Sequence, residues 1–114
     1  MGKKKTPAVR AAPAAVPQIY EAVLVANGAV KKGRLISQAQ AEVRRKAGYD
    51  VAVCGGELKE NRRTAFLVET NANGSVKRCP PHPNAGPQSL PHFQPNPRPP
   101  EGHTFYETPN RKAL

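Results

Sequence analysis

Between residues 37 and 48 the hydrophobic positions follow a helical period. The segment reads SQAQAEVRRKAG, and small apolar residues recur every four positions on one helical face: Ala39, Val43 and Ala47. Ser37 and Gln40 match a capping box, in which each side chain accepts the backbone N–H of the other residue. Basic residues occupy the last turn, where they complement the helix dipole: Arg44, Arg45 and Lys46. This pattern predicts a helix over 37–47.

After this helix the pattern changes to a continuous apolar run. Tyr49 to Cys54 (YDVAVC) is apolar on both faces except at Asp50, which is typical of a strand covered on both sides. In the segment from Glu57 to Asn71, the apolar spacing favours a second helix over one arm of a hairpin.

Two further segments have the composition of short strands. Gln18 to Ala26 (QIYEAVLVA) is rich in β-branched and aromatic residues, and His103 to Thr108 (HTFYET) alternates aromatic with polar residues. Asn27-Gly28 indicates a turn, and Lys31 to Arg34 (KKGR) is interpreted as a basic loop.

These elements predict an α+β fold in a chain of 114 residues, which is short enough for one domain. We expect a small single domain over 18–114, with two helices, a short sheet and a proline-rich ordered loop. Residues 1–17 contain little beyond Lys, Ala and Pro, so we expect a flexible basic linker there.

The most unusual composition lies between residues 79 and 107. This segment holds nine of the thirteen prolines, all three histidines and two of the three phenylalanines of the chain. Proline fixes φ and lacks a backbone donor, so we expect neither a long helix nor a central strand here. Disordered segments are poor in apolar and aromatic residues. The presence of such residues in this segment therefore indicates an ordered loop over 79–102.

The charge balance favours a polyanionic partner. Eighteen Lys and Arg against eight Asp and Glu give a net charge of +10. Charge alone leaves open a nucleic acid, an acidic membrane surface or an acidic protein. No run approaches the roughly 18 apolar residues of a membrane span. On a nucleic acid, and RNA above all, we expect phosphate contacts from a polar and basic set: Asn61, Arg62, Arg63, Lys77 and Arg78.

The clustered histidines suggest acid–base chemistry. Imidazole exchanges protons near neutral pH, so two rings can remove and deliver a proton in one reaction. On RNA, a base takes the 2′-hydroxyl proton, the oxygen attacks the phosphate, and an acid protonates the leaving 5′-oxygen beside a fixed cation. The candidate catalytic residues are these: His82, His92, His103, Arg98 and Tyr106. Which histidine is the acid stays open, and solvated or purely structural histidines are the alternative.

Two metal-dependent arrangements are further alternatives. One combines ligand types that suit zinc or another divalent metal: Cys79, His82, His92 and His103. The other is Asp50 followed by Glu57 and Lys59, an order found where two carboxylates hold a divalent ion beside a lysine in nucleases.

Two blocks of the sequence carry a resemblance to known proteins: LKENRRTAFLVETNANG and PHPNAGPQSLPHFQPNPRPPEGHTFYE. Over residues 33–108 the chain resembles the small carboxy-terminal toxin domains of bacterial polymorphic toxin systems of the RHS or YD-repeat type. The resemblance implies a secreted or delivered effector, often a nuclease, that acts in the cytoplasm of a target cell. It also implies a larger carrier protein and a cognate immunity protein. Where such families use histidines in this loop, the matching positions are His82, His92 and His103.

The leading hypothesis is therefore a toxin-like ribonuclease that uses loop histidines and no metal cofactor. One alternative is a non-enzymatic basic module that binds nucleic acid, with the proline-rich loop serving only as structure. The other is a metal-dependent DNase toxin.

Overall fold

Within the described residues, 16–25, 28–81 and 86–114, six β-strands and two α-helices follow one another along the chain of the computed structural model. With one 3₁₀ turn, η2, their bounds are these: β2 (Gln18–Leu24), β3 (Val30–Ile36), α1 (Gln38–Lys46), β4 (Val51–Cys54), α2 (Leu58–Asn73), β5 (Val76–Cys79), η2 (Gly86–Gln88), β6 (His92–Pro95) and β7 (Thr104–Tyr106). Residues 1–15 of the expected linker and the candidate His82 lie outside the described ranges.

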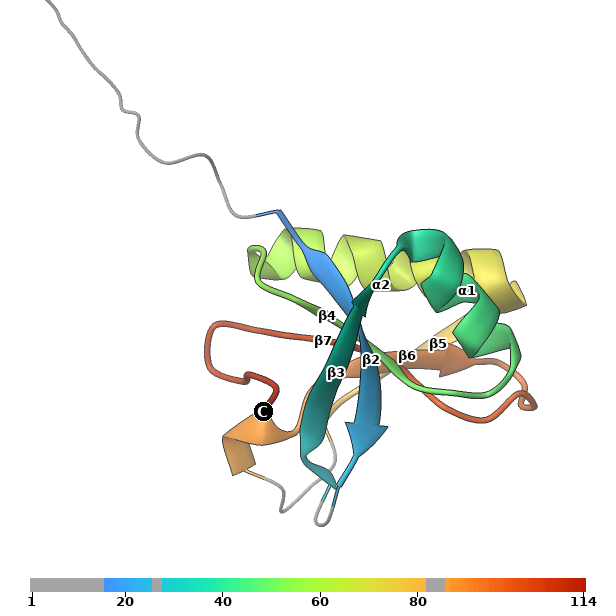
Figure 1. Ribbon diagram of the computed structural model, residues 1–114. Coiled ribbons are helices and arrows are strands. Elements are labelled where there is room, and N and C mark those ends of the chain that lie inside the picture. Colours follow the sequence, from blue (N-terminus) through green and yellow to red (C-terminus); the bar gives the residue numbers. More distant parts are fainter. Residues whose placement is uncertain (1–15, 26–27, 82–85) are drawn as a thin grey trace, which may run out of the picture.

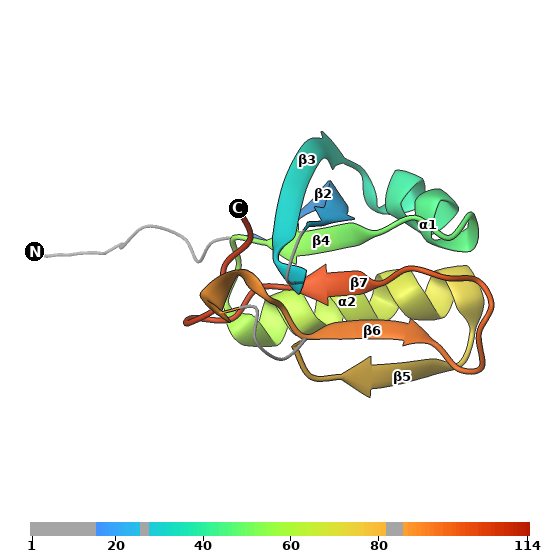
Figure 2. The same ribbon diagram turned by 90° about the horizontal axis from the view of Figure 1, so that it is seen from below.

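The strands form one mixed sheet in the order β3-β2-β4-β7-β6-β5. β4 and β7 are parallel neighbours, whereas the other described pairs are antiparallel. Both helices lie on the same side of this twisted sheet (Figures 1 and 2). The predicted α+β class is confirmed. No helix in the described part of the chain is long and apolar enough to cross a membrane.

Local signals located several elements correctly. The capping box of α1 is present, because Ser37 Oγ accepts the backbone N–H of Gln40 at 3.1 Å and Gln40 Oε1 accepts that of Ser37 at 2.9 Å. The second helix, the buried strand β4 and the strands β2 and β7 are also confirmed. The buried face of α1 differs from the predicted one. Val43 is exposed, and the buried side chains of this helix are Ala41 and Arg45.

Two predictions were wrong. The expected basic loop over 31–34 lies inside strand β3, where Lys31 and Arg34 are exposed and Lys32 is half-buried, while Val30 and Ile36 are buried. The expected absence of a central strand from the proline-rich segment is contradicted by β6, which lies between β7 and β5. Pro95 is the last residue of this short strand, so proline removes no donor from the middle of it.

The sheet carries an apolar cluster on each face. The cluster on the helix side contains nine buried residues: Ile19, Ile36, Ala41, Val51, Val53, Ala65, Val68, Phe93 and Tyr106. The opposite face has a second cluster: Ala22, Val30, Ala52, Cys54, Leu90 and Phe105. Because successive side chains of a strand point to opposite faces, Phe93 lies under the helices while His92 lies on the other side. We call that other side the histidine face, and it carries Asp50, His92, His103 and Phe105.

Candidate active site

Asp50 and His103 meet where two parallel strands begin. Asp50 directly precedes β4 and His103 directly precedes β7, so the parallel pairing brings residues 53 positions apart in sequence to one edge of the sheet. The Oδ1 atom of Asp50 accepts the backbone N–H of His103 at 2.7 Å and lies 3.0 Å from its Nδ1. A carboxylate only accepts hydrogen bonds, so this contact assigns the proton of the neutral ring to Nδ1 and directs Nε2 away from Asp50.

His92 completes the cluster from β6. Its ring stands edge-on to that of His103, with centroids 4.7 Å apart and an interplanar angle of 82°. Phe105 packs against both rings, at 5.3 Å from His92 and 5.0 Å from His103. His92 is only 3% exposed, and its Nδ1 lies 3.4 Å from the carbonyl oxygen of Leu90. The His103 side chain is 15% exposed, so the cluster opens to solvent on the His103 side.

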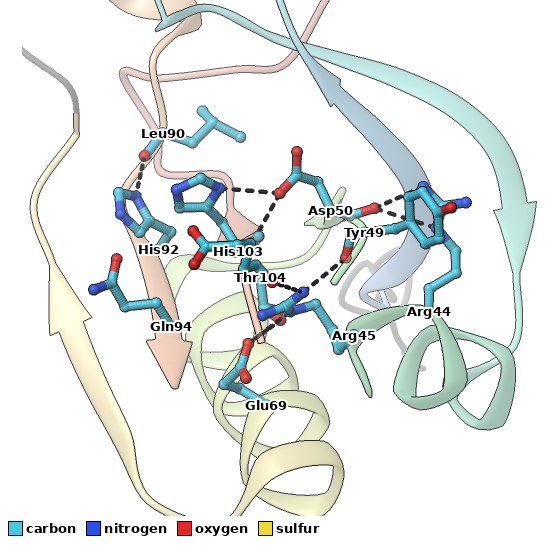
Figure 3. Close-up of polar contacts among 12 residues, drawn as sticks. Arg44, Arg45, Tyr49, Asp50, Glu69, Leu90, His92, Gln94, His103 and Thr104 are labelled. Carbon is cyan, nitrogen blue, oxygen red and sulfur yellow. Dashed lines mark hydrogen bonds and ion pairs between the residues drawn. The ribbon is translucent and has the colours of Figure 1, made fainter. Parts of the chain in front are cut away.

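A fully buried arginine holds the two segments that carry Asp50 and His103. Arg45 Nη1 donates to the carbonyl oxygens of Tyr49 and Glu101, at 2.8 and 3.0 Å. Its Nε donates to Glu69 on α2 at 2.8 Å, and neither side chain is exposed. Figure 3 shows this arrangement beneath the histidines. Tyr49 adjoins Asp50, so the guanidinium determines how the two chain segments approach each other.

Gly102 makes this approach possible. Its φ is +92°, a conformation that favours glycine, and a Cβ atom there would lie 2.5 Å from Arg45 Nη1 and 2.7 Å from the carbonyl oxygen of Gly48. Any larger residue would push the backbone before His103 away from Arg45. A second arginine holds the backbone at Asp50 itself. Arg44 donates to the carbonyl oxygen of Asp50 through Nε and Nη2, at 3.3 and 3.1 Å. Arg44 and Arg45 therefore both hold the backbone around the Asp50–His103 pair.

The predicted cation Arg98 lies beside this cluster. Its Nη2 donates to the carbonyl oxygen of Gly102, the residue before His103, and to Oε1 of Gln94, both at 3.1 Å. Gln94 shares the histidine face of β6 with His92, because the two are separated by one residue. Arg98 Nη1 also forms a salt bridge with Glu101 at 2.6 Å, which offsets part of its charge.

The other predicted catalytic residue within the described ranges, Tyr106, lies on the opposite side of the sheet. It is 3% exposed and packs against Phe93 in the cluster under α2, with ring centroids 5.5 Å apart. The structure therefore brings together His92, His103 and Arg98 but does not bring Tyr106 to them.

The predicted phosphate-binding residues lie in three different places: a hollow on the helix side of the sheet, the histidine face and the protein interior. Arg62, Arg63 and Arg78 line one hollow on the helix side of the sheet. Lys77 precedes Arg78 on β5 and points to the histidine face, where it pairs with Gln94. Asn61 is buried at the start of α2, where its Nδ2 donates to the carbonyl oxygens of Gly56 and Glu107, so its role is structural.

The residues of the two predicted metal sites are not gathered into a metal-binding group in the described part of the chain. Among the described residues, no group of three or more His, Cys, Asp or Glu side chains could hold a metal ion. Cys79 and His92 are cross-strand partners in β5 and β6, while His82 lies outside the described ranges. Asp50 and Glu57 stand before and after strand β4, so the structure does not bring these two carboxylates together.

The pairing of Asp50 with His103 and the burial of Arg45 were missed by sequence reasoning. The available signal for Asp50 was its position as the single charged residue in the apolar run YDVAVC. Arg45 had no such signal, because three consecutive basic residues at a helix end usually face solvent.

No protein-family model, curated protein or solved structure matches this chain.

Proposed function

We propose that this domain is a metal-independent ribonuclease in which His92 and His103 act as the acid–base pair. The observation that carries the proposal is the Asp50–His103–His92 cluster, with a carboxylate 3.0 Å from one ring and the two rings 4.7 Å apart. A carboxylate that orients an imidazole through Nδ1, leaving Nε2 for proton transfer, recurs in enzymes that transfer protons through histidine. The toxin resemblance of the sequence adds to this proposal an effector role and an immunity protein as partner.

The proposed reaction is cleavage of RNA by its own 2′-hydroxyl group. One imidazole takes the 2′-hydroxyl proton while the 2′-oxygen forms a bond to phosphorus. The bond from phosphorus to the 5′-oxygen breaks, and the other imidazole gives that oxygen its proton. The products are a 2′,3′-cyclic phosphate and a 5′-hydroxyl end. Arg98 and Lys77 supply positive charge on the same face for the developing charge on phosphate.

The test is incubation of the purified chain with single-stranded RNA, with and without EDTA, followed by analysis of the product ends. We expect cyclic phosphate ends in both conditions, and a rate loss of about 10²- to 10⁴-fold for His92→Ala and for His103→Ala. Lys31→Ala, on the far edge strand β3, serves as the control and is purified in the same way. Cleavage that both histidine variants retain would overturn the proposal, and cleavage abolished by EDTA would favour the metal-dependent alternative.

The same variants can assign the two histidine roles. An RNA with sulfur in place of the 5′-oxygen has a leaving group that needs no proton. We expect this substrate to restore cleavage by the variant that lacks the acid, while the variant that lacks the base stays slow. Recovery by neither variant would contradict the assignment of one proton transfer to each ring.

A second candidate function is binding of nucleic acid without cleavage. The hollow lined by Arg62, Arg63 and Arg78 favours it, because it is rich in cations and lies away from the histidines. This candidate predicts salt-sensitive binding that survives loss of either histidine, with no RNA breakdown.

A further inference from the structure

A hollow of about 470 Å³ lies between α2 and the strands β5 and β6, on the helix side of the sheet. It is lined by four basic side chains: Lys59, Arg62, Arg63 and Arg78. None of the four forms a salt bridge with a carboxylate among the described residues. The hollow is thus a concentration of unneutralised positive charge, and its volume is in the usual range for ligand sites, about 300 to 1,000 Å³.

An aromatic ring belongs to the same hollow. Phe66 on α2 is 44% exposed and lines the hollow, so part of its ring is accessible beside the cations. Its ring stands edge-on to that of Phe93, with centroids 5.6 Å apart and an interplanar angle of 71°. Phe93 is itself buried and packs against Tyr106, so the exposed ring rests on a rigid base.

We infer that this hollow, which we call the basic groove, binds a single strand of nucleic acid. The cations contact successive phosphates, and one unstacked base packs on the ring of Phe66. A duplex is excluded as the preferred ligand because its bases are stacked on one another and offer no free face to an aromatic side chain. An acidic protein would use the cations equally well but has no need of the exposed ring.

The position of β5 connects the basic groove with the histidine face. β5 is an edge strand, and its consecutive residues Lys77 and Arg78 point to opposite faces of the sheet. A single strand held in the groove can cross this edge and reach the histidine face, with a cation on each side of β5. This link between binding and cleavage rests on the proposed function, whereas binding in the groove does not.

The test is fluorescence anisotropy with a short 2′-O-methyl oligonucleotide, which lacks the nucleophile and cannot be cleaved. We expect Phe66→Leu, which keeps an apolar contact with Phe93, to weaken binding about 5- to 150-fold. Phe66→Tyr keeps the aromatic face and is expected to bind normally. Leu67→Ala changes a neighbouring residue that is 40% exposed and lies outside the hollow, so it serves as the matched control.

Charge is tested separately from stacking. Arg63→Ala and Arg78→Ala are expected each to lower the slope of log affinity against log salt by about 0.7, the value for one lost phosphate contact on a single strand. Lys31→Ala, a basic residue on the opposite edge strand, is the charge-matched control and should leave the slope unchanged.

Three results would overturn the inference. These are equal loss of affinity with Lys31→Ala, no effect of Phe66→Leu, and equal or tighter binding of a duplex or of polyglutamate. Failure of the proposed function is distinguishable from these, because a chain that cleaves no RNA can still bind the 2′-O-methyl strand through Phe66.

Discussion

His92 and Phe93 are neighbours in β6, yet they belong to sites of opposite physical character. On the side of His92, a small set of buried and half-buried titratable groups is oriented by short hydrogen bonds and by the buried Arg45. On the side of Phe93, an exposed ring is surrounded by cations that form no salt bridge with a carboxylate in the described part of the chain. Contacts in a buried site depend on geometry and are little screened, whereas exposed charges act over a longer range and weaken with salt. The two faces should therefore respond to different perturbations.

The largest effect, on the free energy of unfolding, is expected from replacement of Arg45, the buried arginine beneath the histidine face. Arg45→Met leaves the buried carboxylate of Glu69 without its cation, and loss of one partner of a buried ion pair typically costs about 3–5 kcal/mol of unfolding free energy. Urea denaturation followed by circular dichroism measures this change. Lys46→Met, the exposed neighbour on the same helix, is the control and should stay within about 0.5 kcal/mol of the parent.

A double variant sharpens this prediction. Arg45→Met combined with Glu69→Leu removes both charges, so we expect it to be more stable than Arg45→Met alone. If the double variant is as unstable as the single one, the cost comes from lost packing and hydrogen bonds rather than from an unpaired carboxylate.

Asp50→Asn should separate the two faces. The variant keeps the size of the side chain but replaces a charged acceptor by a neutral one, a difference of about 1–2 kcal/mol, or about 5- to 30-fold in cleavage rate. Binding of a 2′-O-methyl strand in the basic groove should not change, because Asp50 lies on the other side of the sheet. A thermal melt checks that the fold is intact. Parallel losses of cleavage and binding would show that the two faces do not act independently.

At neutral pH the smallest effect is expected from a thiol buried on the histidine side of the sheet, because its contribution changes only in alkaline solution. Burial, together with the nearby Glu107, raises the pKa of Cys54 from 9.0 to about 12. The folded state thus favours the neutral thiol, and this contribution to stability is complete below pH 9 and is lost as the pH rises through about 12. Cys54→Ala should reduce the fall of unfolding free energy over that interval, by at most about 1.4 kcal/mol per pH unit.

Urea denaturation at several alkaline pH values measures this slope, and comparison of slopes removes the stability that the substitution itself costs. Val53→Ala, which changes a buried residue of the same strand that carries no titratable group, is the control and should keep the slope of the parent. Identical slopes for the parent and Cys54→Ala would contradict the prediction.

Local signals in the sequence were sufficient for much of the fold. The capping box at Ser37 determines the start of α1 because both of its hydrogen bonds join residues three positions apart. The run YDVAVC predicted a strand buried on both faces, and all four residues of β4 are buried. The unusual grouping of histidines also directed attention to His92 and His103, which do lie together.

The sequence by itself thus determined helix ends, the buried strand, the net charge and the residue types available for chemistry. Only the tertiary structure decided which of them meet, because those contacts depend on strand pairing between distant segments. The parallel alignment of β4 with β7 brings Asp50 to His103, and strand alternation places His92 and Tyr106 on opposite faces of the sheet. Arg45 is buried because Glu69 and two backbone carbonyls surround it, and none of these partners can be identified from the helix that carries it.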